Sequence, residues 1–410
     1  MAKQIVNNPF FTGKTDIPYE FFCDRKKETA LLIKKIANGS NIVLKAPRRT
    51  GKSSLIKHLF KQKEVASNYN TLYVDVYGTK TMDGFIEEFQ SAFFSAPFAR
   101  TEAGKKRITE LFKGLLISAN TDPAGNLVGF SFGLNQPQQV SLTLKEMFAF
   151  LEKTSKPNIV VFDEFQQIND YPERAAAIIR TFVQNLNNTL FIFSGSSQHL
   201  LDNMFEYPNQ PFYRSAASMT LGPIEMNAYS DFCQEMFEKY GKSIDEETVQ
   251  FVYQLFSANT YDMQEVMKET FPEIVKDSKA TKEDVYAAID RLLDSRDEEF
   301  RSILNKIENE KNRKVLYFVL REGLASGLTS GATMRQYGLD NASSVQNALN
   351  VLCGDNVNAV VKVGKNQYQA RDRFFELWFA RKEGNLENKF LHVEERYSKE
   401  MKLRTEVKIV

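Results

Sequence analysis

Residues 46–53 read APRRTGKS, and they lie between two segments of contrasting pattern. The short apolar run at 42–44 predicts a buried strand, whereas residues 53–61 have the spacing of a helix. A loop of this kind between a strand and a helix is typical of a P-loop, in which backbone N–H groups and the helix N-terminus face phosphate oxygens. The motif therefore predicts an α/β domain with a phosphate-binding site. The predicted phosphate-binding residues are Pro47, Arg48, Arg49, Thr50, Gly51, Lys52, Ser53 and Ser54.

Two side chains of this loop have separate predicted roles. The Lys52 ammonium would reach the β- and γ-phosphates, and the Ser53 hydroxyl would be a ligand of Mg²⁺. Ala46 stands where a P-loop usually has its first glycine, at the end of the predicted strand. The alternative interpretation is an ordinary basic turn on the surface. The strand before the loop and the helix after it favour the P-loop.

A second motif lies downstream, where the apolar residues 159–162 are followed by Asp163 and Glu164. This pattern predicts a buried strand that delivers two carboxylates to the carboxyl edge of the sheet, where ligands of α/β proteins bind. Asp163 is the candidate Mg²⁺-associated carboxylate, and Glu164 is the candidate group that orients and polarises the attacking water. The alternative is that the acidic pair only caps the next helix.

A third, weaker signal is the sequence FIFSGSS at 191–197, an apolar strand that ends in small hydroxyl residues. Such a strand would present a polar side chain to the γ-phosphate, and Ser194 is the candidate. The alternative is a glycine- and serine-rich turn without a ligand.

Short, continuously apolar segments separated by helical segments predict a parallel sheet covered on both faces. They lie at 42–44, 71–77, 158–162, 190–193 and 218–221. The predicted domains are an α/β core at 1–225, an α-helical lid at 226–298, a winged helix at 299–380 and a C-terminal tail at 381–410. The core includes an N-terminal box at 8–38 and an insertion at about 95–140, in which residues 127–134 alternate like a hairpin strand.

Six short motifs occur in a characteristic order: NPFF at 8–11, FFCDRKKE at 21–28, APRRTGKSSL at 46–55, FDEF at 162–165, FSGSS at 193–197 and PFYR at 211–214. Over residues 8–380 this order resembles the archaeal-type ATPase family of P-loop proteins, within the wider AAA+ and signal-transducing NTPase group. The resemblance implies ATP as ligand, Mg²⁺ as cofactor and a core with strand order 5-1-4-3-2.

The resemblance also implies roles for two arginines. The N-terminal box of the family packs beside adenine, which makes Arg25 a predicted nucleotide-binding residue. The family's tyrosine-glycine-arginine segment corresponds to Tyr213-Arg214 without the glycine, so Arg214 is a candidate arginine finger or sensor. The alternative is a plain surface arginine. A homo-oligomer, and a role for Arg214 within one subunit or across a subunit boundary, stay open.

Charge restricts the partners of this chain. The formal net charge is +1, which excludes a globally basic surface for nucleic acid. The predicted recognition helix of the winged helix, at 342–352, contains no Lys or Arg, so DNA binding is expected to be weak and carried by Lys362, Lys365 and Arg371. The alternative is a protein-interaction or autoinhibitory module. Its docking face would be Val345, Leu349 and Leu352.

No apolar run approaches the roughly 18 residues of a membrane span, and the N-terminus lacks the apolar segment of a signal peptide. These features predict a cytoplasmic protein with no membrane partner. The leading hypothesis is an ATPase that catalyses Mg²⁺-dependent attack of water on the γ-phosphate, coupled to a conformational change of the winged helix. The alternative is a slow, nucleotide-dependent switch or scaffold that acts through protein interaction.

Overall fold

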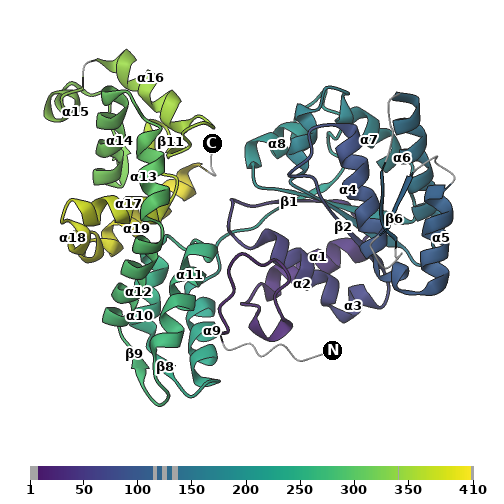
Figure 1. Ribbon diagram of the computed structural model, residues 1–410, viewed down its shortest axis with the longest axis horizontal. Coiled ribbons are helices and arrows are strands. Elements are labelled where there is room, and N and C mark those ends of the chain that lie inside the picture. Colours follow the sequence, from purple (N-terminus) through teal and green to yellow (C-terminus); the bar gives the residue numbers. More distant parts are fainter. Residues whose placement is uncertain (1–7, 114–117, 122–126, 132–136, 340, 408–410) are drawn as a thin grey trace. The chain divides into compact units, whose positions relative to one another are not determined.

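The computed structural model describes residues 8–113, 118–121, 127–131, 137–339 and 341–407. The chain forms two compact units (Figure 1). One unit is residues 13–223, and the other combines the segment up to Thr12 with the chain from Ile224 onward. None of the helices in the described residues is both long and apolar enough to cross a membrane.

The first unit is built on a five-stranded parallel sheet with the order β2-β5-β6-β1-β7. Its strands are β2 (Asn70–Asp75), β5 (Asn158–Asp163), β6 (Thr189–Gly195), β1 (Ile42–Lys45) and β7 (Ala217–Thr220). This order is the predicted 5-1-4-3-2 read from the other edge, so the α/β class and the strand order are confirmed. The register places Asp75 beside Asp163 and Lys45 beside Gly195, which brings the carboxyl ends of the strands to one edge.

Helices cover both faces of the sheet because successive strand residues alternate between two apolar cores. Val160 and Phe162 belong to one core, and Ile159 and Val161 belong to the other. The first core contacts α4 (Met82–Ser95), α6 (Pro137–Glu152), the 3-10 helix η3 (Phe165–Asp170), α7 (Ala175–Val183) and α8 (Gln198–Glu206). The second contacts α1 (Lys26–Ala37), α2 (Lys52–Lys61) and α3 (Lys63–Ala66), on the opposite side of the sheet in Figure 1.

Two peripheral segments complete this unit. The N-terminal box includes the 3-10 helix η1 (Tyr19–Phe21). The predicted insertion begins with η2 (Pro97–Arg100) and α5 (Glu102–Lys113), and continues with an antiparallel hairpin of β3 (Ser118–Thr121) and β4 (Leu127–Ser131). The hairpin agrees with the alternating pattern, of which residues 132–134 lie outside the described residues.

The second unit includes the segment predicted as an α-helical lid. The elements of this segment are α9 (Met226–Glu238), β8 (Ser243–Ile244), α10 (Glu246–Leu255), α11 (Thr260–Thr270), η4 (Phe271–Glu273), β9 (Lys279–Ala280) and α12 (Lys282–Ser295), and α13 (Asp297–Asn305) spans the predicted boundary with the winged helix. Residues 8–12, which the sequence analysis assigned to the core, pack against this lid. The Phe10 ring is almost completely buried against Phe232, Phe237 and Phe271, with ring centroids 5.8–5.9 Å away.

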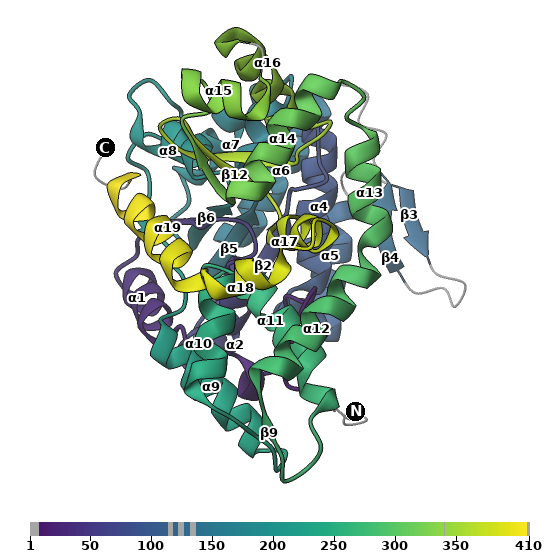
Figure 2. The same cartoon turned by 90° about the vertical axis from the view of Figure 1, so that its left-hand side faces the viewer.

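The predicted winged helix is confirmed, with one additional strand. It contains α14 (Glu310–Glu322), β10 (Leu324–Ser326), α15 (Gly331–Tyr337), α16 (Ala342–Cys353), β11 (Val360–Gly364) and β12 (Gln367–Ala370). The short β10 pairs with β12, so the wing is a three-stranded antiparallel sheet with the order β10-β12-β11. Figure 2 labels β12, the central strand of this sheet.

The hypothesis that α16 docks a partner through Val345, Leu349 and Leu352 is wrong. These side chains are 1%, 2% and 0% exposed, because this face of α16 packs against α14 inside the winged helix. The exposed side of α16 instead carries uncharged residues such as Gln346 and Asn350.

The segment 381–410, assigned only as a tail, contributes to three helices that pack in this unit: α17 (Arg373–Lys382), α18 (Leu386–Leu391) and α19 (Val393–Val407). Glu376 on α17 is fully buried and forms ion pairs with Arg373, Lys389 and Arg396. Arg396 also binds Glu400, which accepts a hydrogen bond from Ser257 of the lid. This buried network ties the lid, the winged helix and α19 together.

Candidate functional site

The P-loop joins β1 to α2 as the sequence predicts. Ala46 is fully buried, and its N–H donates to the Gly195 carbonyl of the neighbouring strand at 3.3 Å. Arg49 (φ 66°) and Gly51 (φ 85°) have left-handed backbone conformations, which turn the chain sharply into α2. The Thr50 hydroxyl closes the loop by donating to the Pro47 carbonyl at 2.8 Å. The loop forms with alanine at its first position because that residue continues the β1–β6 pairing.

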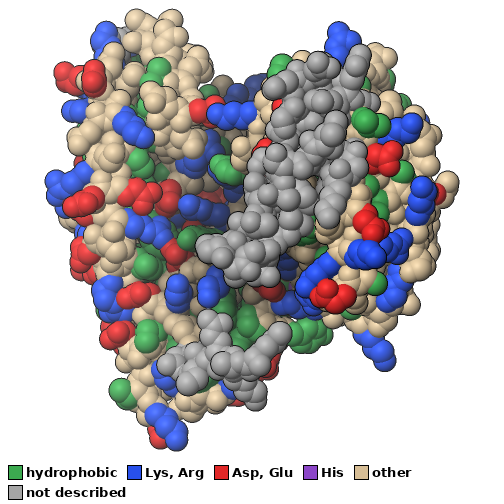
Figure 3. All heavy atoms as spheres, turned by 45° about the vertical axis from the view of Figure 1, so that its right-hand side comes forward, with side chains coloured by type: hydrophobic (Ala, Val, Ile, Leu, Met, Phe, Trp, Pro, Cys, Tyr) green, Lys and Arg blue, Asp and Glu red, His purple; other side chains and the backbone are tan. Residues whose placement is uncertain are grey.

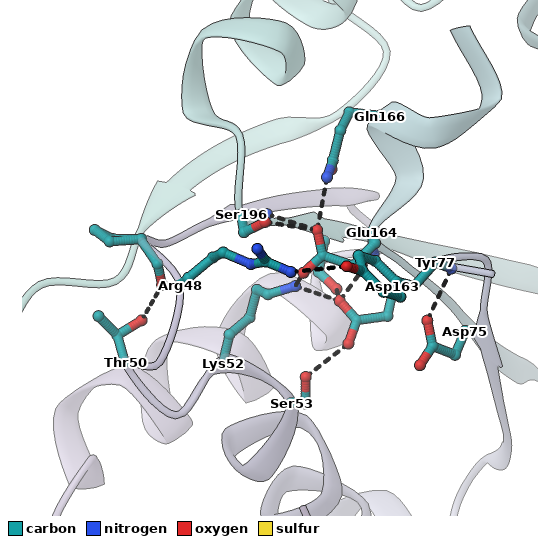
Figure 4. Close-up of polar contacts among 12 residues, drawn as sticks. Arg48, Thr50, Lys52, Ser53, Asp75, Tyr77, Asp163, Glu164, Gln166 and Ser196 are labelled. Carbon is teal, nitrogen blue, oxygen red and sulfur yellow. Dashed lines mark hydrogen bonds and ion pairs between the residues drawn. The ribbon is translucent and has the colours of Figure 1, made fainter. Parts of the chain in front are cut away.

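The Lys52 side chain lies between the two predicted carboxylates (Figure 4). Its ammonium forms an ion pair with Asp163, and it donates to Glu164 Oε1 at 3.1 Å. Lys52 and Asp163 are only 6% and 3% exposed, so the ion pair lies in a low-dielectric environment where charges interact strongly. The structure therefore brings together the two strongest motifs of the sequence.

Asp163 has several hydrogen-bond donors besides Lys52. Ser53 Oγ donates to its Oδ2 at 2.7 Å, Ser194 Oγ donates to its Oδ1 at 2.5 Å, and the Tyr73 hydroxyl donates to Oδ2. Burial would raise the pKa of Asp163, but the Lys52 charge and the hydrogen bonds from Lys52, Ser194 and Tyr73 outweigh it and lower the pKa to about 2. Asp163 is therefore ionised at neutral pH.

Glu164 lies at the start of η3 in a left-handed conformation, with φ 55°. Its Oε2 accepts hydrogen bonds from the Ser196 N–H at 3.1 Å, the Ser196 hydroxyl at 2.7 Å and Gln166 Nε2 at 2.6 Å. Burial raises the pKa of Glu164, but the Lys52 charge and hydrogen bonds from Gln166, Ser196 and Lys52 lower it by more. Both acidic residues are thus carboxylates held in fixed positions.

The structure places the remaining predicted residues in different surroundings. Arg25 is buried, and its guanidinium donates to the backbone carbonyls of Thr50 at 3.3 Å and Pro223 at 3.4 Å. It therefore supports the P-loop through main-chain contacts. Pro47, Arg48 and Arg49 are exposed on the loop, and Arg48 donates to the Tyr77 hydroxyl at 3.0 Å. Ser54 is partly buried in the first turn of α2.

Arg214 is not brought into this cluster by any contact described for it. It is exposed, its backbone is left-handed with φ 52°, and its N–H donates to the Phe205 carbonyl at 2.9 Å. Its guanidinium lies over the Tyr213 ring, 5.0 Å from the centroid. The fully buried hydroxyl of Ser194, the candidate γ-phosphate sensor, donates to Asp163, and its predicted role stays a prediction.

Sequence reasoning missed Tyr73, Gln166 and Ser196. Tyr73 pairs with Val161 in the parallel register, two residues before Asp75 pairs with Asp163, so Tyr73 and Asp163 share one face of the sheet. Once β2 and β5 are taken as neighbours, the alternation of side chains is a signal for this contact. Gln166 and Ser196 contact Glu164 because of the left-handed conformation at Glu164, for which the sequence holds no signal.

A lysine at the start of the helix after β1, held against carboxylates at the end of the parallel strand β5, defines the class of P-loop nucleoside triphosphatases. The chain belongs to a family of ATPase domains found predominantly in Archaea, whose model matches residues 22–266. Residues 298–381 match the model of a probable winged helix domain. The predicted family is confirmed.

Similar proteins agree with this assignment. An uncharacterized ATP-binding protein of Methanocaldococcus jannaschii is 22% identical over an alignment of 326 residues, and the match covers 73% of this chain and 86% of that protein. The Walker-type ATPase of Pyrococcus abyssi has a TM-score of 0.59 and 18% identity, over 90% of this chain and 99% of that chain. The ORC2 protein of Aeropyrum pernix in ADPNP–ADP complexes has a TM-score of 0.54 and 12% identity, over 90% of this chain and 94% of that chain. At these identities the two solved structures show the fold alone.

Proposed function

We propose that this chain binds ATP together with Mg²⁺ and hydrolyses the γ-phosphate, and that the winged-helix module responds to the nucleotide. The observation that carries the proposal is the Lys52 ammonium held between Asp163 and Glu164 at the carboxyl edge of the sheet. The name of the ATP-binding relative and the nucleotide complexes of the Aeropyrum pernix neighbour support ATP as the ligand.

Ser53 and Asp163 are the residues that would hold Mg²⁺. Their oxygens lie 2.7 Å apart, and a hydroxyl with a carboxylate is a hard-oxygen donor set that suits this ion. Among the described residues, no three His, Cys, Asp or Glu side chains converge as a metal site, so substrate phosphates would provide further ligands. When bound, Mg²⁺ supplies positive charge that neutralises the phosphate oxygens.

The proposed steps assign one task to each remaining side chain. Lys52 would bind the β- and γ-phosphate oxygens, aided by the N–H groups at the start of α2. Its transfer to phosphate would release Glu164 Oε1, which now accepts from Lys52 at 3.1 Å. The ionised Glu164 would then accept a hydrogen bond from the attacking water and orient it toward the γ-phosphate.

Steady-state phosphate release, measured over a range of protein concentrations with Mg²⁺ or with EDTA, tests the proposal. We expect release with Mg²⁺ only. Tight ATP binding without turnover would instead support the slow switch or scaffold. Absence of ATP binding would contradict both functions.

Arg214 is predicted to act on the site of a neighbouring subunit in a homo-oligomer. Its exposed guanidinium can reach a second copy, and an arginine supplied in this way contributes on the order of 10³ in rate. The Arg214→Ala and Glu164→Gln variants should each be slow alone and regain activity when mixed, because one of the two sites then combines an intact half from each. No recovery at any ratio, with both variants folded and associating, would argue for a role within one subunit or none.

DNA binding by the winged helix is predicted to be weak and indifferent to sequence. The exposed side of α16 has no cation, and the face in Figure 3 shows basic and acidic side chains interspersed. Lys362, Lys365 and Arg371 are the exposed cations on the wing. With three contacts, log affinity should fall with log salt at a slope no steeper than about −3, because each neutralised phosphate contributes about −0.9. A slope near roughly −6 with nanomolar, sequence-specific affinity would contradict this prediction.

A further inference from the structure

Gln166 is a buried amide that satisfies only part of its hydrogen-bonding capacity. It lies in η3, two residues after Glu164, and is 4% exposed. Its Nε2 donates to Glu164 Oε2 at 2.6 Å, whereas its Oε1 has no hydrogen-bond partner among the described residues. Burying an unpaired polar atom costs free energy that an apolar side chain of the same length would avoid. The bond to Glu164 is therefore the contact that distinguishes glutamine from an apolar residue here.

Gly195 has no side chain, and this leaves space for the Gln166 amide. A Cβ atom at position 195 would lie 1.9 Å from Gln166 Oε1 and 3.1 Å from Leu201 Cδ1. Gly195 is the last residue of β6 and does not have a positive φ, so its backbone conformation does not require glycine. The requirement comes from the space that the Gln166 side chain occupies.

The next residue completes the arrangement around Glu164. The Ser196 N–H and hydroxyl donate to the same Oε2 that Gln166 binds, so three donors converge on one carboxylate oxygen. The other oxygen, Oε1, has Lys52 as its described donor. Donors from η3 and from the residue after β6 therefore hold Oε2, whereas Oε1 faces Lys52 of the P-loop (Figure 4).

We propose that Gln166 is a positioning residue for ATP hydrolysis, which holds Oε2 of Glu164 so that Oε1 is directed at the attacking water, and that Gly195 is required because it leaves room for Gln166. This inference rests on the proposed function. Without the Gln166 donor, the Glu164 side chain gains rotamers in which its carboxylate lies closer to Lys52 and away from the water. A displacement of about 1 Å at a catalytic group can cost on the order of 10²-fold in rate.

The test is Gln166→Met, which keeps the length of the side chain and removes its donor. We expect kcat to fall by about 10- to 100-fold, while the affinity for ATP with Mg²⁺ stays within about twofold of the unaltered chain, because Gln166 has no described contact with the P-loop. Gln167→Met, at the adjacent and partly exposed position, is the matched control and should leave both values unchanged. If Gln166→Met keeps the kcat of the unaltered chain, or loses affinity by the same factor as rate, the inference is wrong.

Gly195→Ala provides an independent arm, because its Cβ would displace the Gln166 amide, whose atoms are the nearest to it. We expect it to lower kcat as Gln166→Met does. The double variant Gly195→Ala/Gln166→Ala should have the same kcat as Gln166→Ala alone. Once the Gln166 side chain is gone, the added Cβ has no amide to displace. Additive losses in this double-mutant cycle would overturn the link between the two residues.

A structural readout keeps the inference testable whatever the rates are. Crystal structures of the unliganded Gln166→Met and Gln167→Met proteins should differ at Glu164, with its bond to Ser196 lengthened or lost only in the former. An unmoved Glu164 carboxylate in Gln166→Met would contradict the inference. Absence of turnover by the unaltered chain would contradict the proposed function, whereas normal turnover by both Gln166→Met and the unaltered chain would contradict only the positioning role.

Discussion

Lys52→Ala is expected to reduce ATP affinity by at least about 100-fold, to the limit of calorimetric detection. The ammonium is the charged group of the P-loop that would bind the β- and γ-phosphates, and charge-assisted hydrogen bonds to phosphate are among the strongest that proteins form. The measurement is titration calorimetry with ATP and Mg²⁺. Comparable affinity in Lys52→Ala and in the unaltered chain would contradict the P-loop assignment.

The structure adds a consequence for stability to this variant. Lys52 is 6% exposed and paired with two carboxylates, so its removal leaves buried negative charge without a partner. Breaking a buried ion pair in this way costs on the order of 3 kcal/mol, and the expected result is a lower melting temperature as well as lost binding. Lys63→Ala, at an exposed position on α3, is the matched control and should change neither property. Binding must therefore be measured at a temperature where Lys52→Ala is shown by circular dichroism to be folded.

The sequence predicts the core of this site because both halves depend on local patterns. The apolar run before Asp163 marks a strand that is buried at every position, and such strands end at the carboxyl edge of the sheet. The loop before Lys52 is anchored in the same way by β1, whose four residues are all buried. When two strands lie near each other in a parallel sheet, the residues that follow them meet without further information.

The contacts around Glu164 could not be predicted because they depend on backbone conformation and on distant side chains. Glu164 adopts φ 55°, which is uncommon for glutamate and turns its carboxylate toward Ser196 and Gln166. No pattern in the residues near Glu164 marks this turn. Of the serines after this strand, the sequence analysis singled out only Ser194. In the structure the fully buried Ser194 binds Asp163, and Ser196 binds Glu164.

The winged helix illustrates a second limit of periodicity. The spacing of Val345, Leu349 and Leu352 correctly indicates one apolar face of a helix, but spacing alone does not say which surface covers that face. In the structure α14 covers it. The same limit applies to the C-terminal segment. Glu376 on α17 forms an ion pair with Arg396 on α19, and no pattern in the sequence indicates that these two helices contact each other.

Glu164→Gln is expected to retain ATP and to lose hydrolysis, with kcat lower by on the order of 10²- to 10⁴-fold. The amide has almost the same shape as the carboxylate, but it has no negative charge with which to polarise water. The surroundings of Glu164 make the loss larger, because Ser196 and Gln166 donate to one oxygen and Lys52 donates to the other. A glutamine side chain has a single oxygen, so its NH₂ group must face donors on one of these two sides.

This arrangement leads to a prediction about binding as well as rate. If the amide oxygen stays with Ser196 and Gln166, the NH₂ group faces the Lys52 ammonium, and repulsion there favours release of Lys52 to the phosphates. ATP affinity in Glu164→Gln should then equal or exceed that of the unaltered chain, while phosphate release falls. Calorimetry and a phosphate-release assay on the same preparation measure the two effects, and Glu173→Gln, at an exposed carboxylate, is the matched control. The proposed role of Glu164 requires its negative charge beside the attacking water, and glutamine lacks that charge. A Glu164→Gln protein that hydrolyses ATP at the unaltered rate would therefore place the catalytic carboxylate elsewhere.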